Sequence, residues 1–179
     1  MPKQKLELTW IGKENRPRLE PRILLEDAAK SYHASHRVSQ KDGFDNRLIF
    51  GDNLLALKSL EQEFAGKIKC IYIDPPFNTQ QAFEHYDDGV EHSLWLSLMR
   101  DRLEILHRLL DKDGTLFVHI DDNEAGYLVV LLDEIFGRPN RVYVVTFRQG
   151  SATGHTQKHY DHDDLANLRD AVKGVDFEA

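Results

Sequence analysis

The chain lacks several features that would place it in a specialised class of protein. It has one cysteine among 179 residues, which excludes a disulfide framework. No apolar run approaches the length of a membrane-spanning helix, and the polar first five residues do not resemble a signal peptide. There is no internal repeat and no low-complexity tract. We therefore expect a globular, cytoplasmic protein built on one main domain, in which Cys70 is a buried packing residue.

An excess of positive charge is also lacking. The formal net charge is −7, whereas proteins that hold nucleic acid unaided usually carry a basic surface. Basic residues are densest near the N-terminus, and the last twenty residues are acidic. If the chain acts on nucleic acid, we expect much of the binding energy to come from elsewhere.

The hydrophobic pattern alternates between strands and helices. We predict strands at residues 47–50, 68–73, 115–120 and 141–147, and helices at 23–36, 53–64, 91–110, 121–136 and 161–173. A long loop at 74–89, a turn at Asp113-Gly114 and a helix stop at Gly137 separate them. This order is typical of an α/β fold with a parallel sheet and right-handed crossovers. The predicted organisation is an arm with a short helix (1–45), a partial catalytic domain (46–150) and a divergent tail (151–179).

The most informative motif is Asp74-Pro75-Pro76-Phe77, directly after the predicted strand 68–73. Ligands of open α/β sheets bind at the carboxyl ends of strands. The Asp74 carboxylate can accept hydrogen bonds from an amino group, and the prolines present carbonyl acceptors at a fixed angle. The Phe77 ring offers a face for stacking. The alternative is a simple strand-terminating turn, but the context favours a site for a planar molecule with an exocyclic amine.

Other polar clusters have structural explanations beside the functional ones. Asp52 follows a predicted strand and could bind the nucleoside part of a ligand, or it could cap the next helix together with Asn53. The run Asp121-Asp122-Asn123 is better explained as a helix N-terminus than as a metal or acid–base cluster. A metal site at His155, His159, Asp161 and His162 is less expected than a solvated loop.

Over residues 45–150 the chain resembles a β-class DNA adenine-N6 methyltransferase, and more narrowly the modification subunit of type III restriction–modification systems. The resemblance rests on ordered motifs at family spacing: 51–57, 71–79, 83–88, 92–99, 113–114, 120–124 and 133–137. It implies a Rossmann-like methyltransferase sheet with flanking helices, incomplete in this chain. It also implies double-stranded DNA as partner, with a homodimer or a restriction subunit in the full-length form.

The resemblance implies a role for each residue of the motif. An adenine flipped out of the duplex would stack on Phe77, where the family usually has tyrosine. Its amino group would donate to Asp74 and to a backbone carbonyl, that of Pro75, next to Pro76. S-adenosyl-L-methionine would supply the methyl group, bound in part by Asp52 and Asp74. We expect no metal.

The sequence contains no Gly-x-Gly, so the glycine-rich turn that this family uses for the methyl donor is absent from it. We therefore expect a truncated or split modification subunit that carries the catalytic half of the site. The alternative is a catalytically inactive remnant that acts only in partner binding or dimerisation. A third interpretation, with amino groups of RNA or amides of proteins as substrate, is disfavoured by the type III motifs.

Overall fold

The computed structural model describes residues 7–20, 22–32, 35–37, 39–40, 43, 45–78 and 92–146. The chain divides into two compact units, Met1–Arg138 and Pro139–Ala179. The first unit contains α1 (Asn53–Phe64), β1 (Ile68–Ile73), α2 (His92–Leu109), β2 (Leu110–Val118) and α3 (Asp122–Leu132). A π-helical turn, Asp133–Gly137, follows α3, and the 3-10 turn Arg138–Asn140 comes next.

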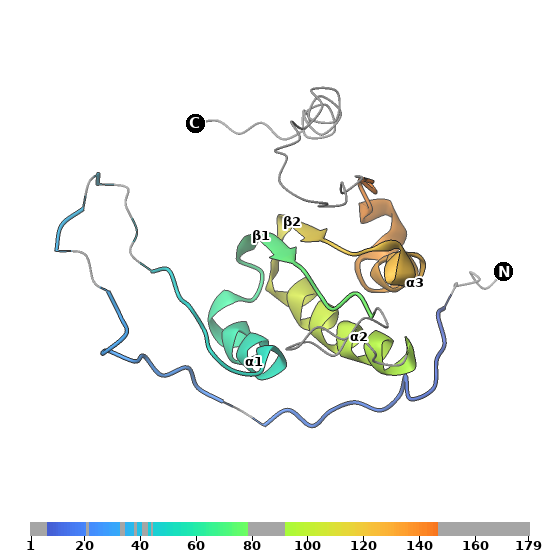
Figure 1. Cartoon of the computed structure of the whole chain (residues 1–179). Coiled ribbons are helices and arrows are strands. Elements are labelled where there is room, and N and C mark those ends of the chain that lie inside the picture. The colour runs from blue at the N-terminus through green and yellow to red at the C-terminus, as the bar shows by residue number, and fades with distance from the viewer. Residues whose placement is uncertain are drawn as a thin grey trace, which may run out of the picture. The chain divides into compact units, whose positions relative to one another are not determined.

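Strands β1 and β2 form a parallel two-stranded sheet in which Ile73 is the partner of Val118. Helices α1 and α2 lie next to each other on one side of it (Figure 1). Ile71 faces the helices and is buried, while the paired Tyr72 and Phe117 are 65% and 51% exposed on the other face. The α/β class predicted from the sequence is thus confirmed for this part of the chain. Because β1 and β2 are parallel, their carboxyl ends lie at the same edge of the sheet.

The core is built mainly on α2. Its buried apolar residues recur every three or four positions, so they form one face that packs against α1, α3 and the sheet. Trp95 and Leu103 are fully buried at its centre. This face contains Trp95, Leu96, Met99, Leu103, Ile105, Leu106 and Leu109, and Leu54, Leu128 and Leu131 meet it from the neighbouring helices.

An ionic contact joins α1 to α2. Glu61 of α1 accepts hydrogen bonds from Lys58 and from Arg108 at the end of α2. Partial burial would raise the pKa of Glu61, but these two basic partners outweigh it and lower that pKa below the ordinary 4.5. The carboxylate is therefore held in its charged form.

Residues 7–20 of the predicted arm lie along α2, and these residues are called the N-terminal arm from here on. The Trp10 indole donates to Ser97 Oγ at 2.8 Å, and Arg100 donates to the carbonyls of Lys13 and Asn15. Arg100 is 2% exposed, so its charge is satisfied inside the protein by the arm's backbone and by its neighbour Asp101. Arg16 adds exposed ion pairs to α2. The arm is thus part of the folded unit.

Two predictions for the segment before α1 are wrong. No helix occurs at 23–36 in its described residues, and the backbone at 47–50 is not a strand. Leu48 and Phe50 are fully exposed, and the Arg47 guanidinium instead donates to Glu63 of α1 at 2.7 and 2.8 Å. A strand needs a paired neighbour and a short helix needs a surface to pack on, and neither segment has one in the described structure.

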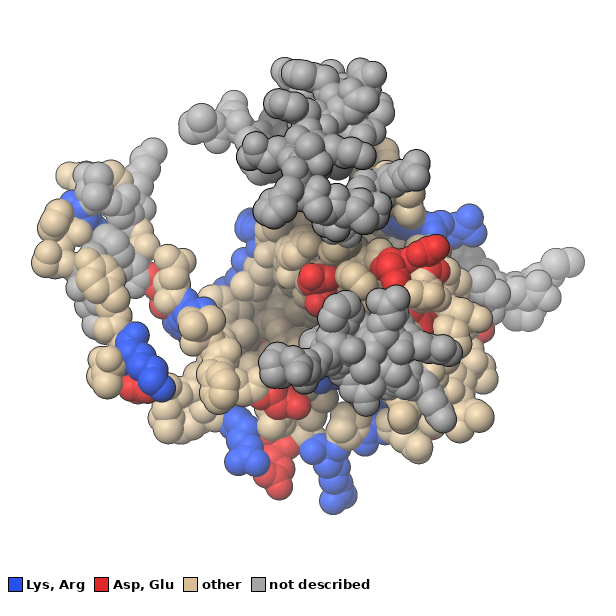
Figure 2. All heavy atoms as spheres, viewed as in Figure 1, with Lys and Arg blue, Asp and Glu red and all other residues tan. Residues whose placement is uncertain are grey.

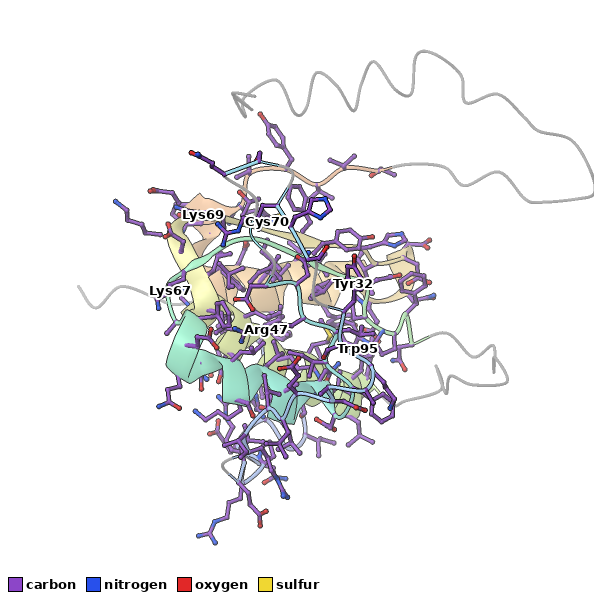
Figure 3. The ribbon with its side chains drawn as sticks, turned by 90° about the vertical axis from the view of Figure 1, so that its left-hand side faces the viewer. Tyr32, Arg47, Lys67, Lys69, Cys70 and Trp95 are labelled. Carbon is purple, nitrogen blue, oxygen red and sulfur yellow. The ribbon has the colours of Figure 1, made fainter. Side chains whose placement is uncertain are left out.

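Three further predictions need correction. Residues 141–146 form no strand, with Val142 and Tyr143 largely exposed. Cys70 is exposed, because it lies on the sheet face opposite the helices (Figure 3). Asp113-Gly114 does not precede the strand but lies within β2, where the register shifts between the pairs Ile68–Leu110 and Cys70–Thr115.

The elements β1, α1 and α2 lie within one residue of the expected bounds. The strand predicted at 115–120 spans Leu110–Val118, and the helix predicted at 121–136 is α-helical only to Leu132, where the π-helical turn to Gly137 takes over. The predicted loop beyond Asn78, the helix at 161–173 and the histidines of the tail fall outside the described residues. The predicted domain boundaries stay a prediction. Among the described helices, none has the length and apolar character to cross a membrane.

Candidate active site

The loop Asp74–Asn78 begins where β1 ends, and His119 begins the segment that follows β2. Since Ile73 pairs with Val118, the next residues along the two parallel strands, Asp74 and His119, meet at the same sheet edge. The His119 amide extends the ladder by donating to the Ile73 carbonyl at 3.0 Å. Pairing of the strands therefore places the motif carboxylate beside an imidazole.

The His119 side chain contacts two groups of the motif. Its Nδ1 lies 3.2 Å from Asp74 Oδ1, and its ring meets the Phe77 ring edge-on with centroids 5.4 Å apart. Both Asp74 and His119 remain partly open to solvent, with side chains 57% and 34% exposed. An accessible carboxylate and an aromatic ring, joined through one histidine, make an edge where a polar planar ligand can approach.

The proline pair is fixed from the helix side. Trp95 of α2 is fully buried, and its indole N–H donates to the Pro76 carbonyl at 2.6 Å. Among the described residues, no hydrogen bond reaches the Pro75 carbonyl. Of the two proline carbonyls, Pro76 is thus engaged by the core, and Pro75 keeps an acceptor that a ligand can use.

A polar cluster built on one buried carboxylate lies at the other end of the loop. Glu124 of α3 is 1% exposed, and its Oε1 accepts from Asn78 Nδ2 and lies against His92 Nδ1, both at 2.6 Å. The His92 ring packs edge-on against Tyr127, with centroids 4.4 Å apart. The cluster therefore joins the loop after β1, the start of α2 and the start of α3.

Asp52 and Asp121 both cap helices. Asp52 Oδ1 accepts from the amides of Leu54 and Leu55 at 2.8 and 3.2 Å, and Asp121 accepts from the Asn123 amide at 3.0 Å. The capping alternative for these aspartates thus has direct geometric support. Asp52 is exposed, so its capping leaves open the predicted contact with a nucleoside.

The structure brings Asp74, Pro75, Pro76 and Phe77 together as one loop and adds four residues that sequence reasoning missed: Asn78, His92, His119 and Glu124. His119 had a usable signal, because it lies near the end of the predicted strand 115–120, and Asp74 directly follows the preceding predicted strand, 68–73. Within the described part of the chain, no group of three or more His, Cys, Asp or Glu residues could hold a metal ion.

Comparison with known proteins identifies the class to which this fold and loop belong. A family model described as DNA methylase, N6_N4_Mtase, matches residues 68–164, more than half of the chain. The chain therefore belongs to this DNA methylase family, and the resemblance seen in the sequence is confirmed.

The similar curated proteins are modification enzymes. The chain is 46% identical over 120 residues to the probable type III restriction-modification enzyme HindVI Mod subunit of Haemophilus influenzae, covering 64% of this chain and 16% of that protein. It is 41% identical over 133 residues to the type II methyltransferase M.EcaI of Enterobacter cloacae, covering 71% and 28%. Identity to the EcoPI Mod subunit of Escherichia phage P1 is 36% over 174 residues, covering 78% and 26%. The chain spans less than a third of the length of these relatives.

Proposed function

We propose that the protein is a site-specific DNA methyltransferase that transfers a methyl group from S-adenosyl-L-methionine to the N6 amino group of a flipped adenine. The observation that carries the proposal is the position of the Asp74 carboxylate at the carboxyl end of β1, where it is exposed and contacts His119, whose ring also meets the Phe77 ring. Membership of the DNA methylase family supports it. We further propose that the two-stranded sheet belongs to a Rossmann-like methyltransferase sheet.

In this mechanism the loop binds the adenine and polarises its amino group. Phe77 stacks on the base, which matches its part-buried position at the loop. Asp74 and the Pro75 carbonyl accept the two amino hydrogens, since the Pro76 carbonyl is already bonded to Trp95. These acceptors draw the nitrogen toward tetrahedral geometry and stabilise the positive charge that develops on it.

The electron balance is that of a direct displacement. The lone pair of N6 forms a bond to the methyl carbon, the carbon–sulfur bond breaks, and its electron pair remains on sulfur. One amino proton is then lost from N6 to solvent. The donor's sulfonium supplies the electrophilic methyl group. Asp52 and Asp74 are the residues proposed to bind the donor, and Asp52 offers an exposed carboxylate for a hydroxyl or amino donor.

Double-stranded DNA is the proposed partner, with a homodimer or a restriction subunit in the full-length form. Charged side chains of both signs are interspersed on the face shown in Figure 2. Together with the net charge of −7, this mixed surface supports binding of DNA mainly through regions other than the described residues.

The test is methyl transfer by the protein in its full encoded length, with nucleoside mass spectrometry of the DNA product. We expect N6-methyladenine from the wild type and none above background from Asp74→Ala. The exposed Asp122 at the start of α3 gives a matched control, and Asp122→Asn should keep the wild-type rate.

Each other outcome identifies a different failure. N4-methylcytosine in place of N6-methyladenine would reject the adenine assignment alone. Retained methylation in Asp74→Ala would reject the role of the carboxylate. A folded wild-type protein that binds a partner but transfers no methyl group to DNA would favour the partner-binding alternative.

A further inference from the structure

Glu124 is a buried carboxylate in the first turn of α3. At 1% exposed it carries a large desolvation cost, which is tolerated only when strong partners compensate it. Capping does not account for it, because Asp121 caps α3, and the exposed Asp122 already provides an acidic side chain near the helix N-terminus. Its Oε1 makes two short contacts, to Asn78 and to His92, and its Oε2 is buried without a hydrogen-bond partner among the described residues.

The contact to Asn78 acts directly on the motif loop. Asn78 follows Phe77 and has a φ of 56°, in the left-handed region that non-glycine residues seldom adopt. Asparagine tolerates this region better than most other non-glycine residues, and contacts of its side chain help to hold it there. The Asn78 amide donates to Glu124 Oε1 at 2.6 Å, so the buried carboxylate stabilises the unusual conformation at the residue next to Phe77.

The contact to His92 anchors Glu124 itself. His92 is the first residue of α2, and its ring is fixed further by Tyr127 of α3. Two contacts on one oxygen, from different elements, restrict where Oε1 can lie. Asn78 is therefore held by a group that the helices, rather than the loop, position.

We propose that Glu124 is a positioning residue for methyl transfer: through Asn78 it fixes Phe77 and the end of the proline loop where the flipped base must stack. The inference rests on the function proposed above and adds a residue that touches neither base nor methyl donor. Trp95 on Pro76, His119 on Asp74 and Glu124 on Asn78 then hold the loop at three separate points.

The first test measures the loop without using activity. Hydrogen exchange is followed by NMR at the Asn78 side-chain amide, the group that bonds to Glu124, and at the Phe77 and Asn78 backbone amides, since Pro75 and Pro76 have no N–H. The proteins compared are wild type, Glu124→Ala, Glu124→Gln and the control Asp122→Asn. We expect exchange about ten- to a hundredfold faster in Glu124→Ala, the loss that follows removal of a charged hydrogen bond. Glu124→Gln keeps an acceptor of the same shape and should recover part of the protection. Unchanged exchange in Glu124→Ala would overturn the proposal whether or not the protein methylates DNA.

The second test separates positioning from general stability. Single-turnover methyl transfer should fall about ten- to a hundredfold in both Glu124→Ala and Asn78→Ala, since small misplacements of reacting groups carry penalties of that size. The KM for DNA should stay near the wild-type value. The double variant should lose no more than the single ones, because both changes remove the same contact.

Two results of this second test would reject the inference. Transfer rates equal to that of Asp122→Asn would show that the loop does not need Glu124. Losses that multiply in the double variant would show that Glu124 and Asn78 act independently. A wild-type protein that transfers no methyl group would reject the proposed function, and hydrogen exchange would still decide whether Glu124 holds the loop.

Discussion

Gly114 and Gly126 should respond in opposite directions to the same substitution by alanine. Gly114 lies in the irregular part of β2, where the strand approaches the start of β1. A Cβ there would meet the Ile68 carbonyl oxygen at 2.7 Å, the Asp111 carbonyl oxygen at 3.0 Å and Leu110 Cδ1 at 2.9 Å. Two of these atoms belong to the backbone, so they cannot rotate away as a flexible side chain could.

The magnitude comes from the two surroundings. Overpacking at Gly114 should cost about 1–3 kcal/mol, of which the lower entropy of the unfolded chain returns about 0.4–1 kcal/mol. Because two of the obstructing atoms are backbone oxygens, the cost should lie in the upper part of that range, about 2–3 kcal/mol, and Gly114→Ala should lower the free energy of unfolding by about 1–2.6 kcal/mol. At Gly126, inside α3, a Cβ would meet nothing within 4 Å. Gly126→Ala should raise the free energy of unfolding by about 0.8–1 kcal/mol, the helix preference for alanine.

The assay is urea unfolding of the 179-residue chain, followed by far-ultraviolet circular dichroism, with the slope compared to ensure that only stability changes. The midpoint should move down for Gly114→Ala and up for Gly126→Ala. A Gly114→Ala chain as stable as wild type would refute the close approach of β1 and β2 at this point. A destabilised Gly126→Ala would refute the open surface at α3.

Three further predictions concern the loop, the arm and pH. Trp95→Phe leaves the Pro76 carbonyl without its donor, so the free energy of unfolding should fall by about 1–3 kcal/mol and methyl transfer should slow. An unchanged rate of methyl transfer would show that this hydrogen bond does not position the loop. Arg100→Leu removes a buried charge, so it should lower the free energy of unfolding by about 2–4 kcal/mol in chemical denaturation and expose the arm to proteolysis. Arg16 is more exposed, so Arg16→Ala should lower the free energy of unfolding by less than about 1 kcal/mol. Equal losses of stability in the two variants would contradict the difference in burial. Because the pKa of Glu61 is lowered in the folded state, its contribution to the free energy of unfolding is present above pH 4.5 and is lost as pH falls through the lower folded pKa. The difference in stability between wild type and Glu61→Gln should therefore shrink in acid titrations. A difference that widens in acid would show that folding raises this pKa instead.

The local pattern of apolar residues was sufficient to predict a helix or strand where that element packs on the core. The spacing of apolar residues in α2 and the apolar run of β1 both predicted elements that the structure contains. The same pattern failed at 47–50 and 141–146, where apolar and β-branched residues form no strand, because strand formation depends on a neighbouring strand that sequence pattern does not reveal. The predicted burial of Cys70 was wrong for a related reason, because helices cover one face of the sheet and Cys70 lies on the other.

The site divides in the same way. Asp74 and Phe77 could be identified because their neighbours in sequence form the motif. Glu124 and His92 could not, since they meet Asn78 only after α2 and α3 have packed, and a lone glutamate at a helix start has an ordinary explanation as a favourable charge.

The two indoles of this chain also give it built-in optical reporters. Trp95 and Trp10 are the only tryptophans in the sequence, and their side chains contact different parts of the structure. Trp95 bonds to the Pro76 carbonyl of the motif loop, whereas Trp10 bonds to Ser97 where the arm meets α2. Emission from a Trp10→Phe chain would thus follow the loop alone as DNA or methyl donor is added, and emission from a Trp95→Phe chain would follow release of the arm. Ligand engagement and arm docking can therefore be timed separately without an attached dye.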